Sequence, residues 1–180
     1  MGAVATKLTI EDFERLPQEE ADYKELVDGE LVDVSGNTPR HTLLRDQLIV
    51  LLQPFVRRRG LGLVLSEQEY RFGNDAHGPD VTFLCPAKNS ALDMDKRVQL
   101  FVPDLAIEIQ SPNDTIARLL RKARKYRSFG TAEDWVFFQK SQAHVFSETR
   151  EVVLDDTAAF EPERIPGVSI PLKNLFDLDF

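Results

Sequence analysis

The sequence has a single cysteine, Cys85, among its 180 residues. One thiol cannot form an internal disulfide or supply a cysteine-rich zinc site, so both kinds of scaffold are excluded. Its setting in "VTFLCP" predicts a strand residue that is buried as a small hydrophobe. The opening "MGAVATKLTIEDFERLP" contains neither the apolar run of a signal peptide nor a membrane span. We therefore expect a cytoplasmic protein with no membrane partner.

The chain also lacks positive charge overall. Its formal net charge is −8 and its isoelectric point is about 4.9, whereas broad affinity for nucleic acid needs clustered Lys and Arg. Two local clusters remain, namely Arg57 to Arg59 and a set made of Arg118, Arg121, Lys122, Arg124, Lys125 and Arg127. Phosphate-binding loops, cofactor fingerprints, helix-turn-helix units and zinc modules are missing, so the sequence supports no cofactor enzyme and names no DNA target.

What the chain does have is an apolar fraction of 42%, enough for the core of a single domain over residues 1–180. Apolar periodicity predicts helices over 9–17, 41–60 and 114–130, with Asp114 as the cap of the last one. Asp28-Gly29 between two alternating runs predicts a hairpin. Strands are predicted over 62–72, 80–86, 102–110, 134–139, 143–148 and 150–156. This order indicates an α/β (α+β) fold with a mixed sheet.

Two carboxylates stand out against these strands. In "PDLAIEIQ" the side chains of Asp104, Glu108 and Gln110 share one face, because alternate residues of a strand point the same way. Asp80 opens the strand "DVTFL", so it meets Glu108 if the two strands are neighbours. Paired carboxylates of this kind suit Mg²⁺ and metal-assisted phosphodiester hydrolysis. The alternative is that Glu108 lies on a solvated strand face and Pro79-Asp80 only starts a turn.

Lys122 strengthens the first interpretation. On a helical wheel it lies about 40° from Tyr126, at the edge of the apolar stripe of its helix. An edge position lets the stem pack while the ammonium reaches over the end of the sheet. The alternative is that all the basic residues of this helix form a solvated face.

The motifs "ELVDGELVDVS", "PRH", "GPDVTFL", "PDLAIEIQSPND", "EDWVFF" and "IPGVSIPL" occur in an order that resembles the Uma-two family, a bacterial group related to restriction endonucleases. That family belongs to the PD-(D/E)XK restriction-endonuclease-like superfamily. The resemblance implies a central mixed β-sheet flanked by helices with an added N-terminal β-hairpin, and a core over about residues 20–176. It also implies a nuclease acting on DNA with Mg²⁺, for which Mn²⁺ can substitute, and compatible with a homodimer.

Carried over to this sequence, the resemblance implies that Asp80 and Glu108 are the metal ligands. The superfamily's strand lysine is replaced by Gln110, which can assist only by coordination or hydrogen bonding. Lys122 matches a lysine that the family carries in the following helix.

Tyr126 matches the tyrosine four residues after that lysine. His41 and Glu25 match a family histidine and a family acid and are accessory candidates. His41 can instead be a surface residue at a helix start, and Glu25 an exposed hairpin residue. We expect His77 and His144 to lie at the surface.

The alternative hypothesis is that the protein has the nuclease fold but no catalytic activity. The missing strand lysine and the acidic composition favour a catalytically inactive nuclease-fold domain that serves as an interaction or accessory module in a mobile-element or defence context.

Overall fold

The central element of the protein is a six-stranded sheet with the strand order β11-β10-β9-β8-β6-β3. The computed structural model describes residues 7–34, 38–138 and 141–177. The strands of this sheet are β3 (Leu63–Ser66), β6 (Val81–Leu84), β8 (Leu105–Ile109), β9 (Glu133–Phe138), β10 (Gln142–Ser147) and β11 (Glu151–Leu154). β8 and β9 are parallel and the other neighbours are antiparallel, so the predicted mixed sheet is confirmed.

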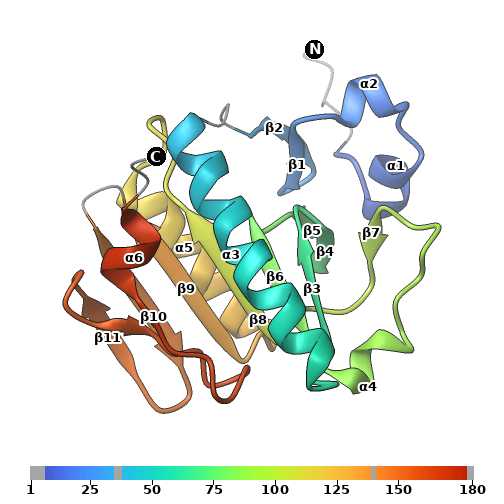
Figure 1. Cartoon of the computed structure of the whole chain (residues 1–180). Helices are drawn as coiled ribbons and strands as arrows, with labels where there is room; N and C mark the ends of the chain where they lie inside the picture. Colours follow the sequence, from blue (N-terminus) through green and yellow to red (C-terminus); the bar gives the residue numbers. More distant parts are fainter. Residues whose placement is uncertain (1–6, 35–37, 139–140, 178–180) are drawn as a thin grey trace.

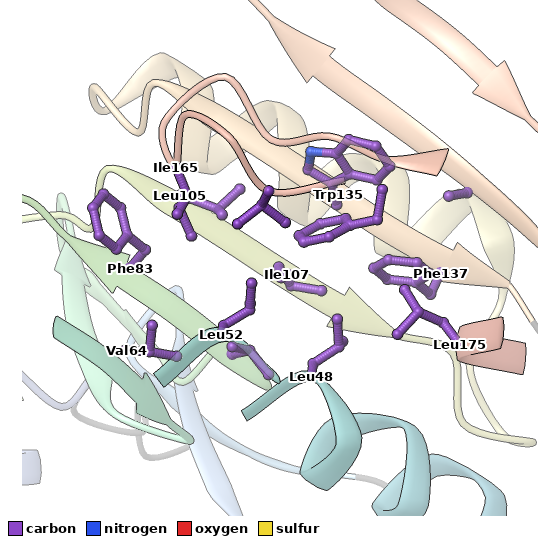
Figure 2. Close-up of a cluster of buried hydrophobic side chains, with 14 of the residues drawn as sticks. Leu48, Leu52, Val64, Phe83, Leu105, Ile107, Trp135, Phe137, Ile165 and Leu175 are labelled. Carbon is purple, nitrogen blue, oxygen red and sulfur yellow. The ribbon is translucent and has the colours of Figure 1, made fainter. Parts of the chain in front are cut away.

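Helices cover both faces of this sheet. α3 (Pro39–Arg58) and α6 (Leu172–Phe176) lie on one face, and α5 (Ile116–Ser128) lies on the other (Figure 1). Three leucines of α3, Leu44, Leu48 and Leu52, recur every four residues and point into the main core. There Leu48 and Leu52 pack in one cluster with Ile107, Trp135 and Phe137 (Figure 2). The flanked sheet expected from the family resemblance is therefore present.

A second sheet of five strands, ordered β2-β1-β5-β4-β7, lies beside the first. Its strands are β1 (Lys24–Val27), β2 (Glu30–Asp33), β4 (Glu69–Phe72), β5 (Asp75–His77) and β7 (Val98–Gln99). The predicted hairpin is confirmed as β1 and β2, but it is one end of this sheet and not a separate addition. The remaining elements are α1 (Ile10–Glu14), α2 (Gln18–Ala21), α4 (Pro86–Asn89), β12 (Ala159–Phe160) and β13 (Ile170–Pro171).

The prediction of one strand over residues 62–72 is wrong. The segment breaks at Glu67, which has φ +52° and donates its backbone N–H to the Asp80 carbonyl over 3.3 Å. β3 before the break joins the central sheet, and β4 after it joins the second sheet. The composition of the next segment, "GNDAHGP", predicts a turn, but the segment contains β5, which pairs with both β1 and β4.

Two local predictions about the helices and the cysteine are settled by the structure. α5 is capped by Thr115, whose hydroxyl accepts from the Arg118 N–H over 3.2 Å, and not by Asp114. Cys85 follows the last residue of β6 and is half-buried, so the prediction of a buried strand residue is wrong, although the residue packs against the main core. Within the described ranges, no helix has both the length and the apolarity needed to cross a bilayer.

Candidate functional site

Pairing of β6 with β8 brings Asp80 and Glu108 together. The antiparallel register matches Val81 with Ile107, so Asp80 just before β6 lies level with Glu108. One Asp80 oxygen, Oδ2, accepts the Ile109 N–H over 2.6 Å. Both carboxylates line one pocket, whose volume is about 380 Å³ when the open space at its mouth is included. The sequence prediction that the two strands are neighbours is therefore confirmed.

Glu108 is held from the α5 side of the sheet. Its Oε1 accepts from the Tyr126 hydroxyl over 2.6 Å, and Lys122 Nζ lies 3.0 Å from Oε1 and 3.1 Å from Oε2. Burial raises the pKa of Glu108 to about 7, with Lys122 opposing the shift and the negative charges of Asp80 and Glu25 adding to it. Negative charge at this carboxylate is therefore only partly balanced by the protein.

Lys122 bridges two carboxylates from two different sheets. Its Nζ donates to Glu25 Oε1 over 3.0 Å as well as to Glu108, and only 14% of its side chain is exposed. Burial works to lower the pKa of Lys122, but Glu108 and Glu25 outweigh it, so the pKa is raised and the group stays an ammonium. A solvated helix face is thus the wrong description of this residue.

Glu25 is buried, with 3% of its surface exposed, so the expectation of an exposed hairpin residue is wrong. Burial works to raise the pKa of Glu25, yet Lys122 and His77 outweigh it and the pKa is lowered. His77 is also buried, with Nδ1 3.1 Å from Glu25 Oε2, and is no surface residue. His144 is half-buried and stacks on Phe146 at 4.2 Å. Glu25 and His77 point inward because β1 and β5 pair along the edge that faces α5.

His41 lies in the site at the N-terminal end of α3. It is buried, and its Nε2 is 3.1 Å from Asp80 Oδ1, so the surface alternative is wrong. Burial works to lower the pKa of His41, but the hydrogen bond to Asp80 and the charge of Asp80 outweigh it and raise the pKa above its ordinary value. Thr38 sets the place of this residue, because its hydroxyl accepts the His41 N–H over 3.4 Å and caps the helix.

Gln110 lies at the edge of the site. It lines a neighbouring, mainly apolar cavity that shares His41 and Ile109 with the carboxylate pocket, and its amide nitrogen donates to the Asp114 carbonyl over 3.2 Å. Asp114 itself lines the carboxylate pocket, where its Oδ2 accepts the Ser111 N–H over 3.0 Å. Sequence reasoning missed Asp114 as a pocket residue because "SPND" was interpreted only as a turn and cap.

Much of the basic cluster on α5 is engaged within the protein. Lys122 binds Glu25 and Glu108, and Lys125 contacts Asp75. The other contacts of the cluster join Arg127 to the Thr131 carbonyl at 2.7 Å, Arg124 to Glu151 at 3.7 Å and Arg118 to Asp114 at 3.8 Å. Arg118 also lines the carboxylate pocket, as Lys122 does, so these two members of the cluster face a ligand bound there.

The donor set fits Mg²⁺. Among the residues with described positions, no three His, Cys, Asp or Glu side chains form a cage for a metal ion. Mg²⁺ does not need such a cage, because it commonly uses one or two carboxylates and completes its octahedron with water and substrate phosphate. Asp80 and Glu108 supply two carboxylates in one pocket. The pKa of Glu108 is raised mainly by burial and further by the charges of Asp80 and Glu25, and a cation there would oppose both effects.

Comparison with known proteins places the chain in a family. A solved structure from Anabaena variabilis, titled as a "putative nuclease belonging to DUF820", superposes with a TM-score of 0.83 and 19% sequence identity. The match covers 94% of this chain and 97% of that chain, which shows a shared fold. No curated protein matches. Residues 10–173 match the family Uma2, described as "Putative restriction endonuclease", and the chain therefore belongs to the Uma2 family.

Proposed function

We propose that this protein is a Mg²⁺-dependent endonuclease that hydrolyses phosphodiester bonds of DNA. The observation that carries the proposal is the position of Glu108, which lines the pocket beside Asp80 and accepts hydrogen bonds from Lys122 and Tyr126. A carboxylate pair with a buried ammonium alongside is the chemistry that phosphoryl transfer to water requires. Membership of a nuclease family agrees with it.

In this proposal each residue has a distinct task. Asp80 and Glu108 would hold Mg²⁺, which supplies charge stabilisation at the phosphate oxygens and lowers the pKa of a bound water. Lys122, kept as an ammonium by its two carboxylate neighbours, stabilises the negative charge that develops on the phosphate and orients the nucleophile. His41 holds the Asp80 carboxylate in place through the 3.1 Å contact, and Tyr126 does the same for Glu108. Gln110 lines the neighbouring cavity, and its assistance by coordination or hydrogen bonding stays a prediction.

A broad groove leads to the pocket and suits a polymeric substrate. It has about 1640 Å³ of open space and shares Glu25, Gly78 and Asp80 with the pocket. Lys24, Arg45 and Arg97 are among its walls, and it contains Tyr23, which is 82% exposed. The three basic residues are each paired with a carboxylate, and five acidic residues also line the groove, namely Asp22, Glu25, Glu67, Glu69 and Asp80. The support for nucleic acid therefore comes from Tyr23, because exposed aromatic rings stack on bases. A homodimer would let each protomer cut one strand.

Mg²⁺-dependent nicking of supercoiled plasmid tests the proposal. We expect conversion by the wild type in Mg²⁺ or Mn²⁺, no conversion in EDTA, and rates lower by roughly 100-fold or more in Glu108→Gln and Lys122→Gln. Lys88→Gln is the matched control, because Lys88 is a half-buried lysine that binds Asp104 and the Val102 carbonyl away from the pocket. Calorimetric titration with Mn²⁺ completes the test. Equal nicking by wild type and Glu108→Gln would refute the proposal.

The second candidate is a catalytically inactive nuclease-fold domain acting as an accessory module. One observation favours it: Lys122 is fully engaged by Glu25 and Glu108, and the strand position of the superfamily lysine holds Gln110. This candidate predicts that Mn²⁺ binds weakly or not at all to the wild type and that no preparation nicks DNA.

A further inference from the structure

We infer that His77 is a positioning residue, which holds the Lys122 ammonium against Glu108 by way of Glu25. The inference rests on the proposed nuclease function, since it assigns a supporting partner to the catalytic lysine. His77 comes from β5 of the second sheet, so the inference gives that sheet a task in the site.

Lys122 cannot be positioned by its own helix alone. A lysine side chain is a flexible stem that loses rotamer freedom when its ammonium is fixed. Here the ammonium is fixed between two acceptors, with Glu108 on β8 and Glu25 on β1 each 3.0 Å away. Glu108 is anchored by the central sheet and by Tyr126, so the second anchor of the ammonium is Glu25.

Glu25 divides its two oxygens between two partners. Oε1 faces Lys122 and lies 3.4 Å from the Gly78 N–H, while Oε2 lies 3.1 Å from His77 Nδ1. The ring contact is close but bent away from an ideal hydrogen-bond direction, and His77 Nδ1 has no well-directed partner among the described residues. Because a carboxylate is planar, fixing Oε2 also fixes the direction in which Oε1 meets Lys122.

His77 is itself held firmly. In the pairing of β5 with β4, His77 lies opposite Tyr70. The His77 ring lies edge-on to the Tyr126 ring, with 5.7 Å between centroids, and is tilted against the Phe72 ring, with 5.9 Å between centroids. On the far side, His77 Nε2 lies 3.8 Å from Asp75 Oδ2.

Asp75 is anchored in turn. It accepts the Asp28 N–H over 2.8 Å and contacts Lys125, which lies one turn after Lys122 on α5. α5 is therefore joined to the second sheet by two lysine–carboxylate contacts, with His77 placed between the two carboxylates, Glu25 and Asp75. Loss of the imidazole would leave Glu25 free to turn, and Lys122 would follow it.

Two variants of His77 separate the effect of positioning from the effect of packing. His77→Asn keeps an N–H donor close to the position of Nδ1, whereas His77→Leu has a similar volume and no donor. His144→Leu is the matched control, because His144 is a half-buried histidine on β10 that stacks on Phe146 and lies outside the pocket lining. Thermal unfolding shows which variants are folded. If His77→Leu fails to fold, His77→Gln replaces it, because the longer amide reaches toward Asp75 and not toward Glu25.

Two readouts follow the lysine itself. The first is the ¹⁵Nζ–¹H signal of the Lys122 ammonium, identified by its loss in Lys122→Gln. We expect His77→Leu to broaden or shift it, and His77→Asn and His144→Leu to preserve it. The second is plasmid nicking, where we expect His77→Leu to lower kcat by roughly 10- to 100-fold with KM unchanged, because a small displacement of a catalytic group has that effect. His77→Asn should recover most of kcat.

The inference is overturned if the Lys122 signal is the same in His77→Leu and in the wild type, or if His77→Asn loses the signal as His77→Leu does. These results are separable from a failure of the proposed function. A wild type that never nicks DNA removes the nuclease proposal, while the ¹⁵Nζ comparison still decides whether His77 positions Lys122. A wild type that nicks DNA, with His77→Leu equal to it in kcat, removes the inference and leaves the nuclease proposal standing.

Discussion

Asp134 gives the sharpest stability prediction, because it is a carboxylic acid enclosed by the protein. Only 1% of its surface is exposed, and neither Oδ1 nor Oδ2 has a hydrogen-bond partner among the described residues. Burial raises the pKa of Asp134 well above its ordinary value, Arg127 opposes the shift, and Glu108 and Glu133 add to it. The nearby Arg127 guanidinium is directed to the Thr131 carbonyl at 2.7 Å instead. We therefore expect Asp134 to stay protonated to a higher pH in the folded state than in the unfolded chain.

The consequence for stability has a definite sign. Between the ordinary pKa of an aspartate and the raised pKa of the folded state, the native protein binds more protons than the unfolded chain, so stability falls as pH rises. The slope is about 1.4 kcal/mol for each pH unit in that interval. Asp134→Asn keeps the shape and does not titrate, so it removes this slope. The buried amide costs about 1–3 kcal/mol for its unpaired groups, but this cost does not depend on pH.

Urea unfolding of wild type and Asp134→Asn at pH 5, 6 and 7 measures the effect. The free energy of unfolding of the variant should rise relative to that of the wild type as the pH rises, by at most about 1.4 kcal/mol for each pH unit. Asp104→Asn is the matched control, since Asp104 accepts the Cys85 N–H over 2.7 Å and pairs with Lys88 at 3.0 Å, and its replacement should destabilise the protein at pH 7. A loss of about 3–5 kcal/mol in Asp134→Asn at pH 7 would instead mean a buried ion pair with Arg127, and the reasoning would be refuted.

The remaining predictions concern packing and backbone conformation, and thermal or urea unfolding checks them all. Leu52→Ala should cost about 2–5 kcal/mol because Leu52 is 1% exposed in the main core, whereas Val50→Ala, at a position 69% exposed on the same helix, should change stability by less than about 0.5 kcal/mol. Gly62→Ala should cost more than about 3 kcal/mol or prevent folding, because its Cβ would lie 1.9 Å from the Leu84 carbonyl oxygen. Gly60→Ala has open space and φ +62°, so about 1–2 kcal/mol of backbone strain is its whole cost. Equal losses of stability in Leu52→Ala and Val50→Ala, or in Gly62→Ala and Gly60→Ala, would contradict these explanations.

The central sheet and its covering helices could be predicted because their signals are local. Gly60 and Gly130 follow the ends of α3 and α5, and the apolar residues before them repeat with clear periods, whereas the caps Thr38 and Thr115 were not predicted. Only the β1–β2 hairpin of the second sheet could be predicted in this way. The strands of this sheet are two to four residues long, and β4 pairs in parallel with β7, about 30 residues further along the chain. Strands this short carry no period, so only long-range pairing defines them.

The same distinction explains which site residues could be found. Asp80 and Glu108 follow from strand alternation, because each lies on a strand that the sequence marks clearly. Glu25 and His77 do not, because one stands beside an Asp-Gly turn and the other within "GNDAHGP", and both contexts are typical of exposed chain. They are buried only because residues about 50 positions apart pair, as Leu26 does with Ala76.

In the proposed nuclease function, Lys122 takes the place of the strand lysine that is missing at position 110. β8 ends at Ile109, and the Gln110 amide turns to the Asp114 carbonyl that begins the approach to α5. The space beside the Glu108 carboxylate is already taken by the Lys122 ammonium, which reaches it from α5 at 3.0 Å. An ammonium arriving from α5 in turn needs a second carboxylate to hold it, and Glu25 of the second sheet provides that contact.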